Sequence, residues 1–123
     1  MNKNLSITAF LGFLAIALGA FGAHALKEKL GLENLKIFET GVRYQMYHVI
    51  VLLFVNSYNQ FSQKTKNTIS VFFFIGILFF SGSLYAITAG GVPVNNIWFI
   101  TPLGGVFFMI GWLYLLFAFI KSN

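Results

Sequence analysis

Residues 41–48 read Gly41-Val-Arg-Tyr-Gln-Met-Tyr-His48, a polar and ionisable stretch in a chain of nearly pure apolar segments. Beyond it the sequence stays apolar only to about Tyr58, whereas a helix needs about 20 residues to cross a bilayer core of about 30 Å. The second membrane span therefore has to begin near residue 40 and to include the polar stretch. Ionisable groups at that depth usually face a bundle interior, a cavity or a partner. Binding chemistry is expected around this stretch.

The composition indicates an integral membrane protein. Of the 123 residues, 58% are hydrophobic and 9% are charged, unlike a soluble domain. No segment alternates as a barrel strand would, so the expected fold class is an all-α, integral membrane four-helix bundle with one transmembrane domain, residues 1–123. The formal charge of +5 comes from Lys and Arg scattered near helix ends, which favours membrane orientation over nucleic-acid binding. The absence of cysteine excludes disulfides.

Four spans are expected, at about residues 5–26, 40–58, 68–89 and 101–120. In the first span Ala15, Gly19 and Ala23 form a small-residue stripe, which lets a neighbouring helix approach closely. In the fourth, Thr101 is expected to cap the helix, with Pro102 at its first position. A secretory signal is the competing interpretation of the first span, because its apolar run ends in an A-x-A-like site at residues 23–25, but the run is longer than a signal core.

The connector of residues 27–39 contains all three acids of the chain. Its second half has apolar residues at three- and four-residue spacing, which predicts a short amphipathic helix at the interface or leading into the second span. A solvated loop is the alternative. Glu39 and Arg43 are four residues apart with the acid first, which favours a helical ion pair.

The charges at the span ends favour one orientation. With four spans, one side of the membrane carries both termini and only cations, Lys3, Lys64, Lys66 and Lys121. The other side carries the three glutamates with Lys27, Lys29, Lys36 and Arg43. Counted strictly, Lys and Arg are tied between the sides. Because Arg43 is expected within the membrane, we favour both termini inside.

The polar motifs of all four spans fall in the same half of the membrane, the half away from the termini. The candidate site residues are His24, Arg43, Tyr44, Tyr47, His48, Ser81, Ser83, Tyr85 and Thr101. Three- and four-residue spacing places Thr40, Tyr44, Tyr47 and His48 on one face of the second helix, and it likewise places Arg43 and Tyr47 on a shared face. One interpretation is a pocket in which Arg43 binds an anionic group, such as a lipid phosphate or a carboxylate. The other is a satisfied structural network that holds the helices together.

Several motifs together indicate a family. In chain order they are Gly19-Ala-Phe-Gly-Ala-His-Ala-Leu26, Thr40-Gly-Val-Arg-Tyr-Gln-Met-Tyr-His48, Phe80-Ser-Gly-Ser-Leu-Tyr85, Ile100-Thr-Pro-Leu-Gly-Gly105 and Gly111-Trp112. They closely resemble the bacterial membrane family catalogued as domain-of-unknown-function family 423, which is also similar to a small mitochondrial transmembrane protein of animals. The resemblance covers nearly the whole chain. It implies a small four-helix protein of the bacterial inner (cytoplasmic) membrane and carries over no activity.

The favoured hypothesis is a non-enzymatic membrane protein whose polar cluster binds a lipid headgroup or small amphiphile, with membrane lipids as partners and no cofactor. An oligomeric transporter or channel is the alternative, weakened because no span carries an acid to couple protons; the small-residue faces are compatible with a homo-oligomer. A third hypothesis is haem or metal ligation by His24 and His48. Catalysis is disfavoured because Cys, Asp and a Gly-rich phosphate loop are absent.

Overall fold

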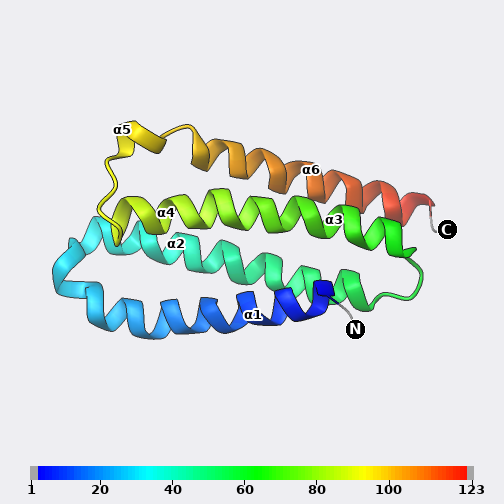
Figure 1. The fold of residues 1–123 in the computed structure, drawn as a ribbon, viewed down its shortest axis with the longest axis horizontal. Helices are drawn as coiled ribbons and strands as arrows, with labels where there is room; N and C mark the ends of the chain where they lie inside the picture. Colours follow the sequence, from blue (N-terminus) through cyan, green and yellow to red (C-terminus); the bar gives the residue numbers. More distant parts are fainter. Residues whose placement is uncertain (1–2, 122–123) are drawn as a thin grey trace.

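The computed structural model describes residues 3–121, apart from the side chain of Ala23. Its elements are α1 (Lys3–Ala17), the π-helical segment η1 (Leu18–Gly22), α2 (Ala23–Ser57), α3 (Gln63–Gly76), the π-helical segment η2 (Ile77–Ser81), α4 (Gly82–Thr88), α5 (Val94–Ile97) and α6 (Ile100–Lys121). The segment η1 joins α1 to the first residues of α2, which turns at Gly31, and η2 joins α3 to α4. The described residues therefore form four long helices that lie side by side, at residues 3–30, 32–57, 63–88 and 100–121 (Figure 1). This agrees with the expected all-α architecture of four helices.

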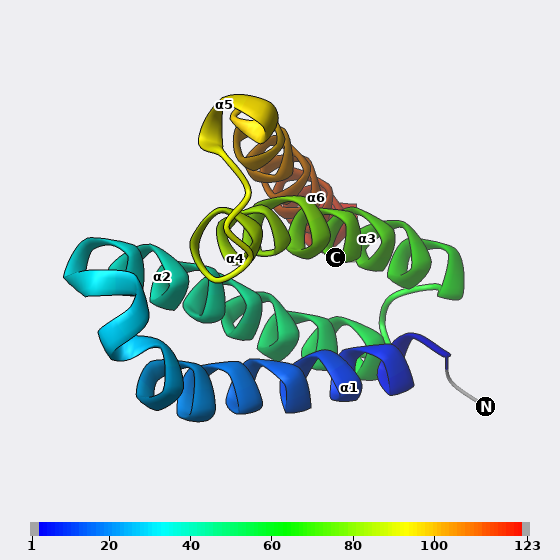
Figure 2. The same cartoon turned by 60° about the vertical axis from the view of Figure 1, so that its left-hand side comes forward.

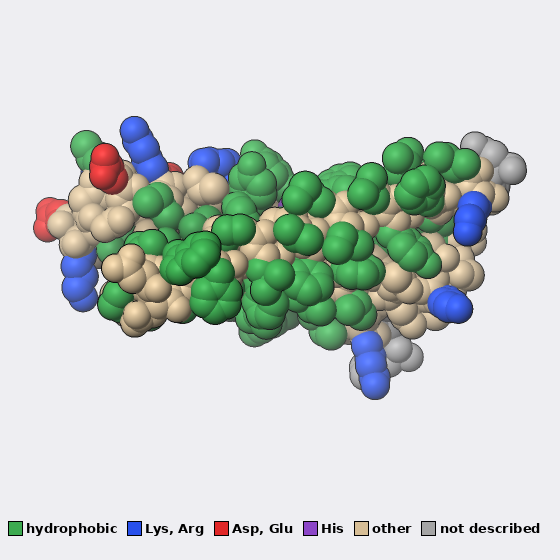
Figure 3. Space-filling view, turned by 90° about the horizontal axis from the view of Figure 1, so that it is seen from above, with side chains coloured by type: hydrophobic (Ala, Val, Ile, Leu, Met, Phe, Trp, Pro, Cys, Tyr) green, Lys and Arg blue, Asp and Glu red, His purple; other side chains and the backbone are tan. Residues whose placement is uncertain are grey.

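Among the described residues, three helical units are long and apolar enough to cross a membrane, Lys3–Gly22, Gln63–Thr88 and Val94–Lys121. The helix α2 is not one of them, because its polar stretch lowers its mean hydropathy. Hydrophobic side chains cover the middle of the elongated molecule on the face shown in Figure 3, and charged side chains lie towards its two ends. Acids are seen at one end only, as the charge pattern of the sequence predicts.

The charged connector between the first two long helices is helical. Gly31 interrupts it with φ 77° and ψ 170°, a left-handed conformation that glycine adopts readily. From Leu32 the helix continues without interruption to Ser57, so the second half of the connector leads into the predicted span, and its position at the membrane interface stays a prediction. The Arg43 Nη2 donates to Thr40 Oγ1 at 3.1 Å, whereas the sequence suggested Glu39 as its partner.

Two helix starts differ from the sequence prediction. The third long helix begins at Gln63 rather than near residue 68, because the Ser62 Oγ accepts the Thr65 backbone N–H at 3.2 Å and caps the helix. The fourth begins at Ile100, so Thr101 lies inside the first turn. Its hydroxyl bonds to Ser83 on α4 instead of capping α6. The prediction that Thr101 is the N-cap is therefore wrong.

The helices pack in a row that turns at α6. The helix α2 contacts α1 on one side and α3, η2 and α4 on the other, while α6 packs on α3 and η2 (Figures 1 and 2). A Cβ on Gly104 would lie 2.8 Å from the Phe80 Cα, so α6 crosses η2 in backbone contact. An apolar core lies between α2, α3, η2 and α6 and includes Leu52, Val55, Ile69, Phe73, Ile77, Phe108 and Leu115.

The small-residue stripe of the first helix faces α2 as far as it is described. Ala15 is fully buried, and a Cβ on Gly19 would approach the Val42 Cγ1 to 3.2 Å. The side chain of Ala23, the third predicted member, lies outside the described part of the chain. Small residues here let α1 lie close against α2, as expected.

Candidate functional site: a buried polar network and a groove at Arg43

The polar stretch on α2 is divided between two faces of the helix. Gln45 and His48 are buried, whereas Arg43, Tyr44 and Tyr47 are exposed. His48 is 4% exposed and Tyr47, the residue before it, is 52% exposed. The prediction that His48 shares a face with the two tyrosines is therefore wrong, because the helix turns its imidazole into the interface with α6.

His48 has a fixed partner at each ring nitrogen. Its Nδ1 lies 2.7 Å from the Tyr44 carbonyl oxygen, and the Trp112 Nε1–H donates to its Nε2 at 3.1 Å. An indole N–H can only donate, so Nε2 is the acceptor and the imidazole is the neutral Nδ1–H tautomer. The ring also stacks on Phe108, with centroids 3.7 Å apart and planes 6° apart. Ligation of a haem or metal by His48 would require loss of one of these hydrogen bonds.

Gln45 joins three of the long helices. Its Nε2 donates to the Leu11 carbonyl on α1 at 2.7 Å, and its Oε1 accepts the Tyr85 hydroxyl from α4 at 2.7 Å. Sequence reasoning left Gln45 out of the candidate set although it lies in the polar stretch. The signal in the sequence was its spacing, because Gly41, Gln45 and His48 recur every three or four residues and so share one face of the helix. In the structure this face is buried.

Hydroxyl groups form hydrogen bonds between the third long helix and its neighbours. The Ser81 Oγ donates to the Gly41 carbonyl at 2.7 Å, across the interface with α2. The Ser83 Oγ donates to the Phe80 carbonyl at 2.9 Å and lies 2.5 Å from the Thr101 Oγ1 on α6. Among the described residues, no buried side-chain nitrogen or oxygen lacks a hydrogen-bond partner. We call Gln45, His48, Ser81, Ser83, Tyr85, Thr101 and Trp112 the inner network.

Arg43 lies outside the inner network, on an open groove between the first two long helices. The groove has a volume of about 370 Å³ and is lined by Ala15, Ile16, Gly19, Ala20, Val42, Arg43, Met46 and Tyr47. Its lining is almost wholly apolar, and Arg43 and Tyr47 are its two polar residues. Such a surface suits a molecule with an apolar chain and an anionic group. We call it the Arg43 groove.

The structure therefore separates the candidate residues into three places. His48, Ser81, Ser83, Tyr85 and Thr101 belong to the inner network, Arg43 and Tyr47 line the Arg43 groove, and Tyr44 packs on Tyr47 and Phe80 with ring centroids 5.6 and 4.9 Å away. His24 is exposed near the start of α2 and belongs to neither. Within the described part of the chain, no group of three His, Cys, Asp or Glu side chains could hold a metal ion.

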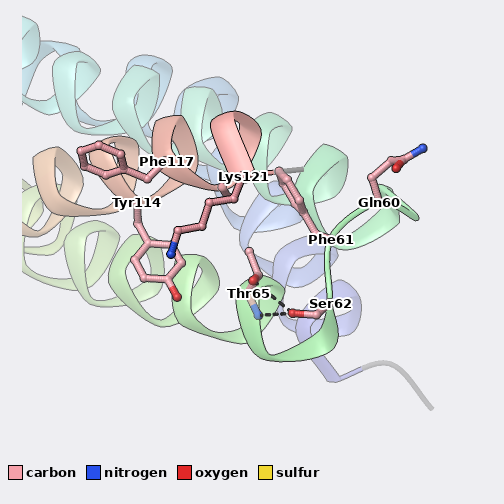
Figure 4. Close-up of a pocket in the computed structure, with 8 residues that line it drawn as sticks. Gln60, Phe61, Ser62, Thr65, Tyr114, Phe117 and Lys121 are labelled. Atoms are coloured by element: carbon pink, nitrogen blue, oxygen red, sulfur yellow. Dashed lines mark hydrogen bonds between the residues drawn. The ribbon is translucent and has the colours of Figure 1, made fainter. Parts of the chain in front are cut away.

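A second cavity lies at the end of the molecule where α6 finishes (Figure 4). It has a volume of about 590 Å³ and is lined by Gln60, Phe61, Ser62, Thr65, Tyr114, Phe117, Ala118 and Lys121. Sequence reasoning missed it, because its lining comes from a polar turn and from the end of a distant apolar helix. We call it the Lys121 pocket.

Comparison with known proteins gives consistent matches over nearly the full chain. The model of a family described as "Protein of unknown function (DUF423)" matches residues 18–105. A UPF0382 membrane protein of Haemophilus influenzae is 42% identical, covering 99% of this chain and 97% of its own. The UPF0382 membrane protein YwdK of Bacillus subtilis is 40% identical, covering 98% of each chain. The UPF0382 inner membrane protein YgdD of Escherichia coli is 35% identical, covering 95% of this chain and 88% of its own. No solved structure matches.

Proposed function

We propose that this chain, which belongs to the DUF423 family, is a non-enzymatic, four-span inner-membrane protein that binds an anionic phospholipid in the Arg43 groove. One observation carries the proposal: Arg43, an exposed cation, lines an open apolar groove whose lining includes no acid. The phosphate would bind at Arg43 and an acyl chain would lie along the groove. The inner network has a structural role in this proposal.

The pairing of α1 with α2 supports α2 as a membrane-spanning helix in addition to the three described helices that are long and apolar enough by themselves. The Asn4 Nδ2 donates to the Asn56 Oδ1 at 3.0 Å, and the Gln45 Nε2 donates to the Leu11 carbonyl at 2.7 Å. A later residue of α1 thus contacts an earlier residue of α2. The two helices therefore lie side by side and run antiparallel. A helix paired in this way with a spanning α1 also crosses the bilayer.

The same pairing supports a position for Arg43 near the interface away from the termini. Val42 packs against Gly19, close to the end of α1–η1, whereas Asn56 pairs with Asn4 near its start. A long Arg side chain at such a place keeps its head at the level of the lipid phosphates. Tyr44 and Tyr47 are exposed beside it, and tyrosines are enriched at this level of the membrane.

The chemistry of Arg43 fits a phosphate. A guanidinium has five N–H donors in a planar fork that matches phosphate oxygens. Arg43 directs one nitrogen, Nη2, to the Thr40 hydroxyl, which leaves further donors for a ligand. Because no acid lines the groove, its charge is not neutralised locally and an anionic headgroup is preferred over a zwitterionic one.

Native mass spectrometry of the gently solubilised protein, titrated with phosphatidylglycerol, tests this proposal. We expect Arg43→Ala to weaken binding about tenfold, since a charge-assisted hydrogen bond contributes about 1.5 kcal/mol or more. Lys36→Ala is the matched control, because Lys36 is an exposed cation of α2 that does not line the groove. Ala20→Phe should also weaken binding by filling the groove without a change of charge. Equal binding by the Arg43→Ala and Lys36→Ala proteins would contradict the proposal.

A further inference from the structure

We infer that the Lys121 pocket is a second lipid site, which binds the phosphate headgroup of an anionic phospholipid from the leaflet on the side of the termini. It shares no residue with the Arg43 groove. The inference therefore goes beyond the proposed function, and either site can be wrong without the other.

The pocket is built from two segments that are distant in the sequence. The turn after α2 and the first turn of α3 form one wall, and the last turns of α6 form the other. Figure 4 shows the Lys121 side chain extending towards Tyr114, while Ser62 and Thr65 lie on the wall formed by α3 and Gln60 points away from the other side chains. A volume of about 590 Å³ is ample for a headgroup, because sites for small ligands span roughly 300–1,000 Å³.

The lining combines apolar residues with cationic and hydroxyl groups. Phe61, which is buried in the core, and Ala118 are among its apolar residues. The Ser62 Oγ accepts the Thr65 backbone N–H and donates to the Thr65 Oγ1 at 3.1 Å, so the Thr65 hydroxyl hydrogen can be directed at a ligand. With the Lys121 ammonium and the Tyr114 hydroxyl, the pocket offers three donors and has no acid in its lining. This set of groups favours a phosphate.

The location of the pocket favours a lipid over a soluble anion. Lys121 follows the apolar run of α6, so its ammonium lies where phospholipid phosphates lie. Lys3, Lys64 and Lys66 belong to the same side in the predicted topology, which carries no acid. One edge of the pocket is Phe117, which is 56% exposed on the outer face of α6. An acyl chain can leave the pocket over this ring into the bilayer.

The inference is tested in the Arg43→Ala background, so that the other site does not contribute to the signal. Phosphatidylglycerol is titrated into the purified full-length protein and bound lipid is counted by native mass spectrometry. Lys121→Ala should weaken binding about tenfold, as expected for loss of one charge-assisted contact. Lys64→Ala, which removes the same charge from the same side outside the pocket, should change it less than about twofold. Equal effects of the two substitutions would show a general attraction to cations and would overturn the inference.

Further measurements distinguish a phospholipid from other ligands of the Lys121 pocket. Ala118→Phe fills the pocket while every charge is kept, and it should abolish the binding that remains in the Arg43→Ala protein; retained binding would overturn the inference. Phosphatidylcholine should bind markedly more weakly than phosphatidylglycerol, and equal binding would overturn the preference for an anionic lipid. Inorganic phosphate at millimolar concentration should fail to displace the lipid. Displacement would identify a soluble anion as the ligand and would overturn the assignment to a phospholipid.

Discussion

At position 48 the imidazole has two fixed partners, the Tyr44 carbonyl and the Trp112 indole N–H. At position 43 the guanidinium has one described partner, Thr40, and is otherwise exposed. Removing the partner of a buried polar group destabilises the folded protein, because water cannot replace the lost hydrogen bond. An exposed polar group is free to bind a ligand. The two positions therefore belong to different functions, although they lie only five residues apart.

We expect Trp112→Phe to destabilise the protein by about 1–2 kcal/mol, because the His48 Nε2 would keep its burial and lose its donor. Thermal unfolding followed by circular dichroism in detergent measures the effect. Trp98→Phe is the control, since Trp98 is 65% exposed in the connection before α6. A Trp112→Phe protein as stable as the Trp98→Phe protein would contradict the role of this hydrogen bond.

At the scale of single residues, the sequence predicted that polar groups are buried but not the direction in which each side chain points. A polar stretch within a short apolar run predicts buried polar groups, and Gln45 and His48 are buried. The direction of each side chain depends on where the neighbouring helices lie, which spacing alone leaves open. His48 was grouped with Tyr47 for this reason, and the partner Trp112, 64 residues away in the chain, could not be inferred.

At the scale of the elements, the close crossing of α6 over η2 depends on one glycine of a pair. A Cβ on Gly104 would meet the backbone of Phe80, whereas a Cβ on Gly105 would have no atom within 4 Å. Backbone atoms cannot move aside as a flexible side chain can, so even a methyl group at Gly104 forces the two helices apart. The adjacent glycines therefore offer a matched pair of substitutions.

We expect Gly104→Ala to destabilise the protein by about 2 kcal/mol or more, through overpacking of the interface. Gly105→Ala should be neutral or stabilising by up to about 1 kcal/mol, because alanine is the better helix former. Unfolding of the two variants in the same detergent gives the comparison. Equal stability of the two, or a less stable Gly105→Ala protein, would contradict the backbone contact between α6 and η2.

The helices themselves were predictable, because long apolar runs exceed the length of a bilayer core. Their boundaries were less so. The Ser62 cap extends the third long helix towards its N-terminus, and Gly31 allows the connector to turn and then to continue as helix. Both depend on short-range hydrogen bonding or backbone conformation, which hydropathy does not record.

For the whole molecule, charge and pairing together give the proposed topology. Acids lie at one end of the face shown in Figure 3, and α2 is antiparallel to α1 by the contacts described above. Four crossings then place both termini on the side of the turn before α3. With Arg43 counted within the membrane, that side has the larger number of Lys and Arg residues outside the spans, which favours the cytoplasm.

The chain has no cysteine, so single cysteines report this topology directly. We expect a membrane-impermeant maleimide applied to intact spheroplasts to label Glu33→Cys and Asn95→Cys and to leave Asn59→Cys unlabelled until the membrane is broken. All three native residues are exposed. Labelling of positions 33 and 59 from the same side would show that α2 does not cross. Labelling of position 59 alone would show the reverse orientation.

The central claim is that Arg43 binds lipid while the inner network holds the fold. The most direct measurement compares Arg43→Ala with Gln45→Ala for bound phosphatidylglycerol and for unfolding temperature in lipid-free detergent. We predict that Arg43→Ala loses the phosphatidylglycerol of the Arg43 groove, so that fewer lipids are bound per chain than in the wild type, and that it unfolds at the wild-type temperature. We predict that Gln45→Ala keeps the lipid and unfolds at a lower temperature, because loss of its bonds to Leu11 and Tyr85 costs about 1–2 kcal/mol. An Arg43→Ala protein that binds as much phosphatidylglycerol as the wild type would contradict the claim.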